Sequence, residues 1–585
     1  MTERQTSGAL AASPAGDARR CGSRTSSARH PDVSSRPRCV PLGVGLSTFR
    51  FVDLFAGIGG FHAALSALGG ECVYVAEMDD DARAVYKTAW LADVAEDFPF
   101  TRDINDDVPP LDDVSTIAEL AETARRAGGG TLKHIPDFDV LAAGFPCQAF
   151  SKSGHQKGVL DETRGTLFYN ILRIVAEKHP KIVFLENVRN LVGPKHRDST
   201  FRTIVEALRG VGYVVSDKPT LISPHKIANH LGGGPQVRER VYIMAIRRDL
   251  AVNETEFPGF DFGSWDPTTW RIAETKLWDE APAAISEAWL RSADPETAAR
   301  LASLCDVDGR DLAVADEEWV APWRDLLAAV VNNGLPDGAV PFPGHPIWFR
   351  VAEPTWRASQ YAEAAAMGQP WKADFVRKSV KFLDDYATEI DAAGAREEIL
   401  ALGNNSWKKL EWQAGDARSL DECLIQLRPS GIRIKKATYA PALVAITQTP
   451  ILGSDMRRLS PYEAGRLQGF PDRVYEAMAR LRHDGSRKPE QWDRAFYKQF
   501  GNAVHVGAVK FALVQFMGHH FRSALPDDPA LAGLYEACSQ TRVWDETVAP
   551  SIGTPTFHQP DLMRILEPAA ETARGSDVHV EALAS

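Results

Sequence analysis

The sequence predicts an α/β fold, with a mostly parallel sheet covered by helices on both faces. From Phe51 to about Asp249, short apolar runs alternate with amphipathic, helix-like stretches such as GTLFYNILRIVAEK. The apolar runs are FVDLF, ECVYVAE, FDVLAAG, KIVFLEN and RVYIMAI. Parallel strands need crossover connections, usually helices, so this alternation is typical of such a sheet.

The change in composition along the chain divides it into five regions. Residues 1–48 are rich in Ser, Arg, Ala, Gly and Pro and are predicted to be disordered, whereas 49–249 form the first part of the α/β domain. Residues 250–456 carry many Trp and Pro and lack the alternating rhythm, which predicts a second domain inserted into the first. The rhythm returns in 457–525, and 526–585 are predicted to be a partly disordered extension.

Composition indicates a globular chain. It has 585 residues, 44% hydrophobic and 25% charged, which is enough to build a buried core. We find no apolar run long enough to span a bilayer and no secretory signal at the start, so we expect a cytoplasmic protein without a membrane partner. The seven cysteines are odd in number and scattered, which argues against a disulfide framework and a zinc site; no metal is expected.

The charge of the chain is unevenly distributed. A formal net charge of -12 does not favour a nucleic-acid partner. Basic residues nevertheless cluster from Arg428 to Tyr439 and at Arg457 and Arg458, which would suit a basic cleft on an acidic body. Each cluster taken alone could equally be a solvated charged surface.

A glycine turn follows the first predicted strand, in DLFAGIGGF. Gly57, Gly59 and Gly60 would let a ligand approach the backbone, although His62 replaces the third glycine of the dinucleotide-binding fingerprint. Such a turn alone is more often structural. Glu77, about twenty residues on, could bind ribose hydroxyls, and Asp103 after the next short strand could accept from an adenine amino group. Each acid alone could be a solvated loop residue, but together they describe an adenosyl pocket.

The fourth predicted strand leads into GFPCQAFSKSG, which contains Cys147. A cysteine is usually a small buried hydrophobe. Here Pro146 precedes it, and a polar loop with Ser151 and Ser153 follows, which favours an exposed nucleophile under a mobile lid. The position beyond a strand's carboxyl end is where such folds keep their chemistry.

Charged residues also occur in the next two predicted strands, KIVFLEN and QVRERVYIMA. Glu186 comes at the end of KIVFLEN, where partial burial would raise the pKa of its carboxyl; a helix-capping role is the alternative. Arg238 and Arg240 alternate in QVRERVYIMA and so share one face, where they could hold a base carbonyl, a phosphate or Glu186. Paired arginines are more often solvated.

Taken in order, these motifs resemble the DNA (cytosine-5)-methyltransferase family, in its bacterial restriction-modification branch. The matching motifs are FVDLFAGIGGF, GFPCQAFSKSG, DETRGTLFYNILRI, ENVRNL, QVRERVYIMA, RLSPYEAGRLQGFP and FYKQFGNAV. The resemblance implies a Rossmann-like S-adenosylmethionine-dependent methyltransferase fold. It also implies that residues 250–456 are the target-recognition domain.

The resemblance assigns roles residue by residue. Cys147 would add to carbon 6 of a flipped-out cytosine, Glu186 would hydrogen-bond its ring nitrogen 3, Arg240 would hold its carbonyl oxygen, and Arg238 would buttress the site. Ser151 and Ser153 would contact DNA from the lid. Met78 departs from the family pattern, in which an aromatic ring often stacks on the adenine. S-adenosylmethionine would be surrounded by Phe55, Gly57, Gly59, Glu77, Met78, Asp103, Ile104, Pro146, Leu167 and Asn502.

The implied partners are double-stranded DNA and, from the habit of the family, a cognate restriction endonuclease, with a monomer as the default state. A tRNA cytosine-5 methyltransferase is the first alternative, although its recognition segment is compact. The second is a catalytically silent DNA-binding homologue, which the intact motif residues disfavour. A nicotinamide-dependent oxidoreductase would leave Cys147 unexplained.

Overall fold

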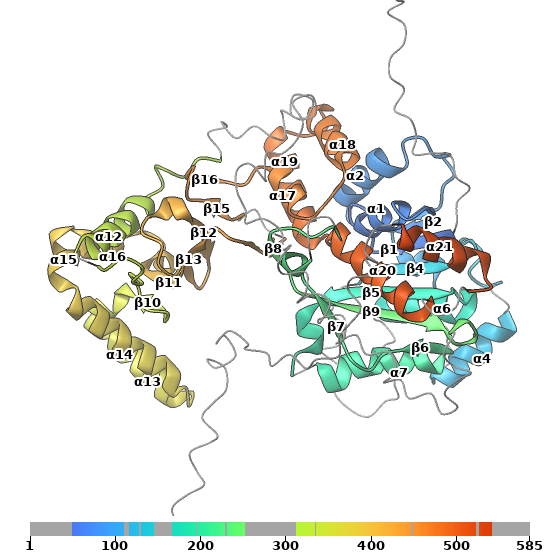
Figure 1. Ribbon diagram of the computed structural model, residues 1–585, viewed down its shortest axis with the longest axis horizontal. Coiled ribbons are helices and arrows are strands. Elements are labelled where there is room, and N and C mark those ends of the chain that lie inside the picture. Colours follow the sequence, from blue (N-terminus) through green and yellow to red (C-terminus); the bar gives the residue numbers. More distant parts are fainter. Residues whose placement is uncertain are drawn as a thin grey trace, which may run out of the picture. The chain divides into compact units, whose positions relative to one another are not determined.

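A central sheet organises the α/β part of the chain in this computed structural model (Figure 1). The described residues are 49–109, 116–127, 130–145, 167–194, 196–227, 231–251, 312–333, 335–445, 449–521 and 526–540. All of them belong to one compact unit. Among them, no helix is both long enough and apolar enough to cross a membrane.

The sheet has eight strands in the described part of the chain. Its hydrogen-bonded order is β3 (Phe100–Thr101), β2 (Gly70–Ala76), β1 (Phe49–Leu54), β4 (Val140–Gly144), β5 (Ile182–Val188), β9 (Arg240–Arg247) and β6 (Tyr213–Val215), with β7 (Thr220–Ile222) also paired to β9. The pairs from β3 to β5 are parallel, whereas β9 runs antiparallel to β5, β6 and β7. The predicted fold class is therefore confirmed, and RVYIMAI forms the antiparallel strand β9.

Both faces of this sheet are buried, which explains why its strands read as nearly continuous apolar runs. Successive side chains of β5 alternate: Val183 and Leu185 pack into one hydrophobic cluster, and Ile182 and Phe184 into another. The first cluster includes residues of α4 (Ile117–Ala127), α6 (Leu167–Lys178) and α7 (Arg202–Gly210). The second includes residues of α1 (Gly60–Ser66), α20 (Val506–Phe521) and α21 (Pro529–Ser539). Helices from both ends of the sequence thus complete one domain (Figure 1).

A third cluster joins the closing part of the chain to the first strands. It contains residues of α2 (Asp80–Trp90), α17 (Pro461–Arg466), α18 (Asp472–His483) and α19 (Pro489–Asn502). Ser460 caps α17, with Pro461 at its first position and Glu463 completing a capping box. The short helix α3 (Ile104–Asp107) begins after Asp103, whose side chain accepts the amide of Asn105.

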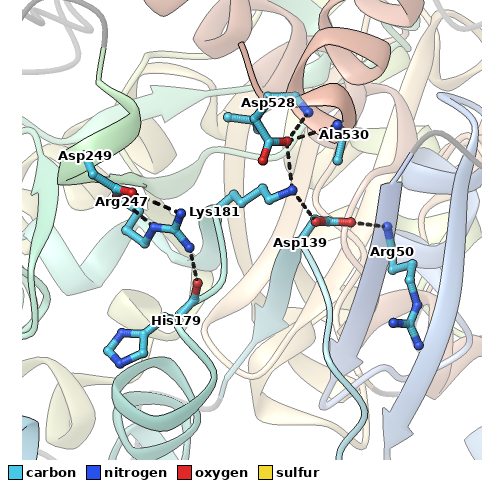
Figure 2. Close-up of polar contacts among 9 residues, drawn as sticks. Arg50, Asp139, His179, Lys181, Arg247, Asp249, Asp528 and Ala530 are labelled. Atoms are coloured by element: carbon cyan, nitrogen blue, oxygen red, sulfur yellow. Dashed lines mark hydrogen bonds and ion pairs between the residues drawn. The ribbon is translucent and has the colours of Figure 1, made fainter. Parts of the chain in front are cut away.

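Part of the predicted C-terminal extension packs onto the α/β domain through α21 (Figure 2). Asp528 accepts the amides of Ala530 and Leu531 at 3.0 and 3.1 Å, capping this helix. Its carboxylate also pairs with Lys181 at 2.7 Å, and Lys181 pairs with Asp139 at 2.8 Å. Asp139 and Lys181 directly precede β4 and β5, so this network lies at the amino edge of the sheet.

The region 312–458 builds a separate hydrophobic cluster around a second, six-stranded sheet. Its strands, in pairing order, are β10 (Ile347–Trp348), β11 (Lys409–Gln413), β13 (Gly431–Lys436), β12 (Cys423–Arg428), β15 (Ile451–Leu452) and β16 (Arg457–Arg458). The helices of this region are α12 (Val320–Asn332), α13 (Pro354–Ala366), α14 (Pro370–Asp385), α15 (Ala387–Ala392) and α16 (Ala395–Ala401). Strand β14 (Ala440–Pro441) pairs with β8 (Gln236–Val237), which connects the two regions.

Candidate active site

A cavity of about 480 Å³ lies at the carboxyl ends of the parallel strands. This volume is in the range of small-molecule sites. Phe55 follows β1, Glu77 follows β2 and Phe145 follows β4, while Glu186 lies near the end of β5. Among the residues predicted from sequence, the cavity is lined by Phe55, Gly57, Glu77, Met78, Asp103, Ile104, Leu167, Glu186, Arg238, Arg240 and Asn502. The strand-end argument therefore places the acids of the predicted adenosyl pocket and Glu186 around one space.

The glycine turn has two different roles within a few residues. Gly57 adopts a positive φ of 56°, and a Cβ there would meet no described atom within 4 Å, which leaves room for a ligand against the backbone. Gly59 does not line the cavity. Its φ is 87°, and a Cβ there would lie 2.3 Å from Trp90 Nε1, so glycine is needed for packing against that ring. Trp90 in turn donates to the carbonyl of Ile58 at 3.0 Å.

Glu77 is held in place by backbone amides on both of its oxygens. The amide of Gly57 donates to Oε2 and that of Asp79 to Oε1, each at 2.7 Å. Burial raises the pKa of Glu77, although these amides oppose the shift. Each carboxylate oxygen has more than one lone pair, so the fixed carboxylate still has acceptor capacity for a ligand.

Two further side chains define the same end of the cavity. One oxygen of Asp103 is already occupied, because Oδ1 accepts the amide of Asn105 at 3.0 Å and its side-chain nitrogen at 2.7 Å. Asn105 thereby orients the carboxylate of Asp103. Met78 is 56% exposed and offers apolar surface where the family pattern has an aromatic ring.

Glu186, which is buried, and Arg240, which is partly exposed, form an ion pair at another part of the cavity. Arg240 Nε lies 3.1 Å from Glu186 Oε1. In the antiparallel register of β5 with β9, Val188 stands opposite Arg240, which explains how the two side chains meet. Burial raises the pKa of Glu186 more than Arg240 and Arg238 lower it. The pocket therefore favours a protonated Glu186 relative to a carboxyl in water.

Arg238 ties three distant chain segments together behind this pair. It is 2% exposed and donates to the carbonyls of Leu443, Gly501 and Ala503 at 3.0, 2.9 and 2.7 Å. Burial lowers the pKa of Arg238 to about 9, and Arg240 adds to this effect. Gly501 allows close contact here, because a Cβ on it would lie 2.3 Å from the backbone of Val444. Arg238 thus fixes the ends of α19 and of the chain that returns from the second sheet.

Several predicted residues fall outside the described part of the chain: Pro146, Cys147, Ser151 and Ser153. The described residue directly before Pro146, Phe145, is held by a hydrogen bond. Asn187, which is 3% exposed, donates from Nδ2 to the carbonyl of Phe145 at 2.9 Å. Sequence reasoning used the neighbouring Glu186 and missed this anchoring role of Asn187.

Sequence reasoning also missed Asp79, Arg102 and Lys498 as lining residues. Lys498 donates to Asp79 Oδ2 at 2.6 Å, which joins α19 to the start of α2. Lys498 stands in the FYKQFGNAV motif, four positions before Asn502, on the same helical face. That spacing was the available signal.

Comparison with known proteins agrees with this architecture. The family described as C-5 cytosine-specific DNA methylase matches residues 49–298 and 361–516. The type II methyltransferase M.AluI of Cellulosimicrobium cellulans is 36% identical over 524 residues, which cover 80% of this chain and 91% of that protein. The type II methyltransferase M.HhaI of Haemophilus parahaemolyticus is 40% identical over 215 residues, covering 36% of this chain and 54% of its own length. By its ordered motifs, its fold and these matches, the chain belongs to the C-5 cytosine-specific DNA methylase family.

Proposed function

We propose that this DNA (cytosine-5)-methyltransferase binds S-adenosylmethionine at the Glu77 side of its cavity and a flipped-out cytosine of duplex DNA at the Glu186 side. The observation that carries the proposal is that one cavity contains both sets of groups. A donor and an acceptor bound there would react without leaving the protein.

The residues at the Glu77 side suit an adenosyl group. The carboxylate of Glu77 is oriented by two amides and suits ribose hydroxyls, and the open backbone at Gly57 leaves space beside it. Asp103, oriented by Asn105, suits the adenine amino group. Met78 and Ile104 supply apolar surface for the base. When bound, S-adenosylmethionine supplies an electrophilic methyl group on its sulfonium.

At the other side, the chain's own groups would activate the cytosine. Cys147, as a thiolate, adds to carbon 6, and the electrons of the ring move toward nitrogen 3. Glu186, in its protonated form, donates to that nitrogen and disperses the charge, while Arg240 holds the carbonyl oxygen. Carbon 5 would then take the methyl group as its bond to the sulfonium breaks, which would leave the donor as a neutral thioether. Loss of its proton to a base and elimination of the sulfur release the methylated base and Cys147.

Both faces of the base must be reached, so the cytosine has to leave the duplex at a cost of a few kcal/mol. We propose that the region 250–456, acting as the target-recognition domain, and the segment carrying Ser151 and Ser153 supply the compensating DNA contacts.

The main experiment measures methyl transfer and its position together. The purified chain and its Cys147→Ala variant are incubated with tritiated S-adenosylmethionine and duplex DNA, and the products are mapped by bisulfite sequencing. We expect 5-methylcytosine at one recurring sequence and none with the variant. Methylation of tRNA instead would favour the RNA-modifying alternative, and transfer to neither substrate would favour the silent homologue.

We further propose that the methylation protects DNA in a restriction-modification system in the cytoplasm, with the enzyme acting as a monomer. The type II designation of the relatives supports the first part. A plasmid methylated by the enzyme should resist an endonuclease encoded beside its gene. Light scattering during gel filtration tests the monomer, which a dimer mass would refute.

A further inference from the structure

Two regions of the chain place basic side chains together where β8 and β14 pair. The short 3-10 helix Pro224–Lys226 precedes β8, and Tyr439 directly precedes β14. The rings of His225 and Tyr439 are 5.3 Å apart, and the amide of Ala440 donates to the carbonyl of Pro235 at 2.7 Å. Residues of the catalytic region and of the chain returning from the second sheet therefore form one continuous surface.

Strand β13 carries three basic side chains, and two of them form ion pairs with acidic residues. Arg433 bonds to Glu411 at 2.7 Å and Lys436 to Asp416 at 3.0 Å. Lys435 lies between them, is partly buried and makes no ion pair with any described residue. Burial lowers the pKa of Lys435, and Arg433 adds to this effect. A cation in this setting is stabilised by an external anion.

The opposite side of the junction contributes two more donors. Lys226 also makes no ion pair within the described ranges, and the nearby acid Glu239 is engaged by Arg189. Among the charged groups around His225, Lys226 and Lys435 disfavour its protonation and Glu239 favours it. Burial is the largest effect, and together these groups lower the pKa of His225 to about 4. His225 is therefore neutral at physiological pH.

A hydrogen bond with Ser223 holds the ring of His225 through its Nδ1. Ser223 Oγ accepts the amide of Arg238 at 2.9 Å and lies 2.8 Å from His225 Nδ1. When the Ser223 hydroxyl donates to Nδ1, the ring proton of the neutral histidine is on Nε2. No hydrogen bond from a described residue reaches Nε2, so in this tautomer its N–H is available to a ligand. The same serine links His225 to Arg238, which lines the cavity.

We propose that Lys435, Lys226 and His225 form a binding site for a backbone phosphate of duplex DNA close to the flipped cytosine. The inference rests on the proposed function and adds a specific contact to it. Two ammonium groups and one neutral N–H donor match the several acceptor oxygens of a phosphodiester. Because the site joins both regions of the chain, a phosphate bound there would fix the register of the duplex relative to Arg238 and the cavity.

The test is the salt dependence of DNA binding by the full chain. Fluorescence anisotropy gives the Kd for a labelled mixed-sequence duplex over a salt series. Lys435→Met should lower the slope of log Kd against log salt by about 0.9, the loss of one phosphate contact. Loss of this contact should make binding about eightfold weaker at about 0.1 M salt. Lys436→Gln is the matched control, because Lys436 points to the opposite sheet face and is paired with Asp416; its slope should change less.

A slope for Lys435→Met equal to that of the unaltered chain would overturn the site. Donor binding and the melting temperature report whether the variant is folded; if it is not, Lys226→Gln decides by the same criterion. If the unaltered chain bound no duplex, the proposed function itself would fail. If the unaltered chain binds and methylates DNA, but neither Lys435→Met nor Lys226→Gln changes the salt slope, the phosphate site is refuted and the proposed function stands.

Discussion

Replacing Glu186 by Gln should lower the activity of the enzyme while leaving its stability equal or slightly higher. The side chain is buried, it pairs with Arg240 at 3.1 Å, and burial raises its pKa in spite of that partner. Glutamine keeps the shape and a hydrogen-bond donor, but it cannot donate a proton to the cytosine ring. General acid catalysis contributes about 10²–10⁴-fold. We therefore expect kcat to fall by that factor, equivalent to about 3–5 kcal/mol in the barrier.

The same substitution should leave the fold intact or slightly more stable. A carboxyl whose pKa is raised by folding binds its proton more tightly in the folded state, so its ionised form destabilises that state above the raised pKa. Each tenfold increase in proton affinity corresponds to about 1.4 kcal/mol. Glutamine carries no charge, so the melting temperature at pH 8 should be equal or higher. Removal of the counter-charge of Arg240 limits this gain.

The assays are methyl transfer to duplex DNA, calorimetry of donor binding and thermal denaturation. Donor affinity should be unchanged, because Glu77 rather than Glu186 faces that ligand. The unaltered enzyme should lose rate as the pH rises through the pKa of Glu186, and the variant should lack this alkaline limb. Asp249→Asn is the control, since Asp249 does not line the cavity and its Oδ1 lies 2.7 Å from Arg247 Nε. A variant retaining more than a tenth of the activity, or melting several degrees lower, would refute the reasoning.

Three further predictions concern the donor side and the amino edge. Glu77→Gln removes the charged acceptor of two amides, so donor affinity should fall about 10-fold to 100-fold by calorimetry while DNA affinity is retained; unchanged donor affinity would count against Glu77 as the ribose ligand. Gly59→Ala places a Cβ against Trp90 at positive φ and should destabilise by about 2–4 kcal/mol in denaturant melts, whereas Gly57→Ala should cost about 1–2 kcal/mol yet weaken donor binding more; equal melts would contradict this contrast. Asp528→Ala removes the cap of α21 and the Lys181 pair, which should cost about 1–2 kcal/mol without changing kcat. Burial alone would raise the pKa of Asp528, but the hydrogen bonds from Lys181 and from the amides of the helix outweigh it, so the pKa is lowered. This stability should therefore disappear as the pH falls through the lowered pKa. A pH-independent difference in melting temperature would refute this explanation.

Several features of the protein could be predicted because they are encoded in local sequence. The apolar runs identify the strands, since a strand buried on both faces must be apolar throughout. Carboxyl ends of parallel strands meet at one edge, so Glu77, Asp103 and Glu186 could be assigned to one site before any coordinates were known. The expectation that Gly59 lies beside the cofactor shows the limit: a glycine pattern does not reveal whether a ligand or Trp90 occupies the missing side chain's space.

Contacts between residues far apart in the chain were decided by the tertiary structure. Sequence could pair Arg238 with Arg240 by alternation. It could not predict the three carbonyls that hold Arg238, because these come from two segments, at Leu443 and at 501–503, that lie far from Arg238 along the chain. The Lys181–Asp528 pair joins residues 347 positions apart, and it docks α21 onto a domain that sequence had ended earlier. Motifs specify chemistry through the residue types they contain. Positions, pKa shifts and unpaired charges depend on burial and on partners, which exist only once the chain has folded.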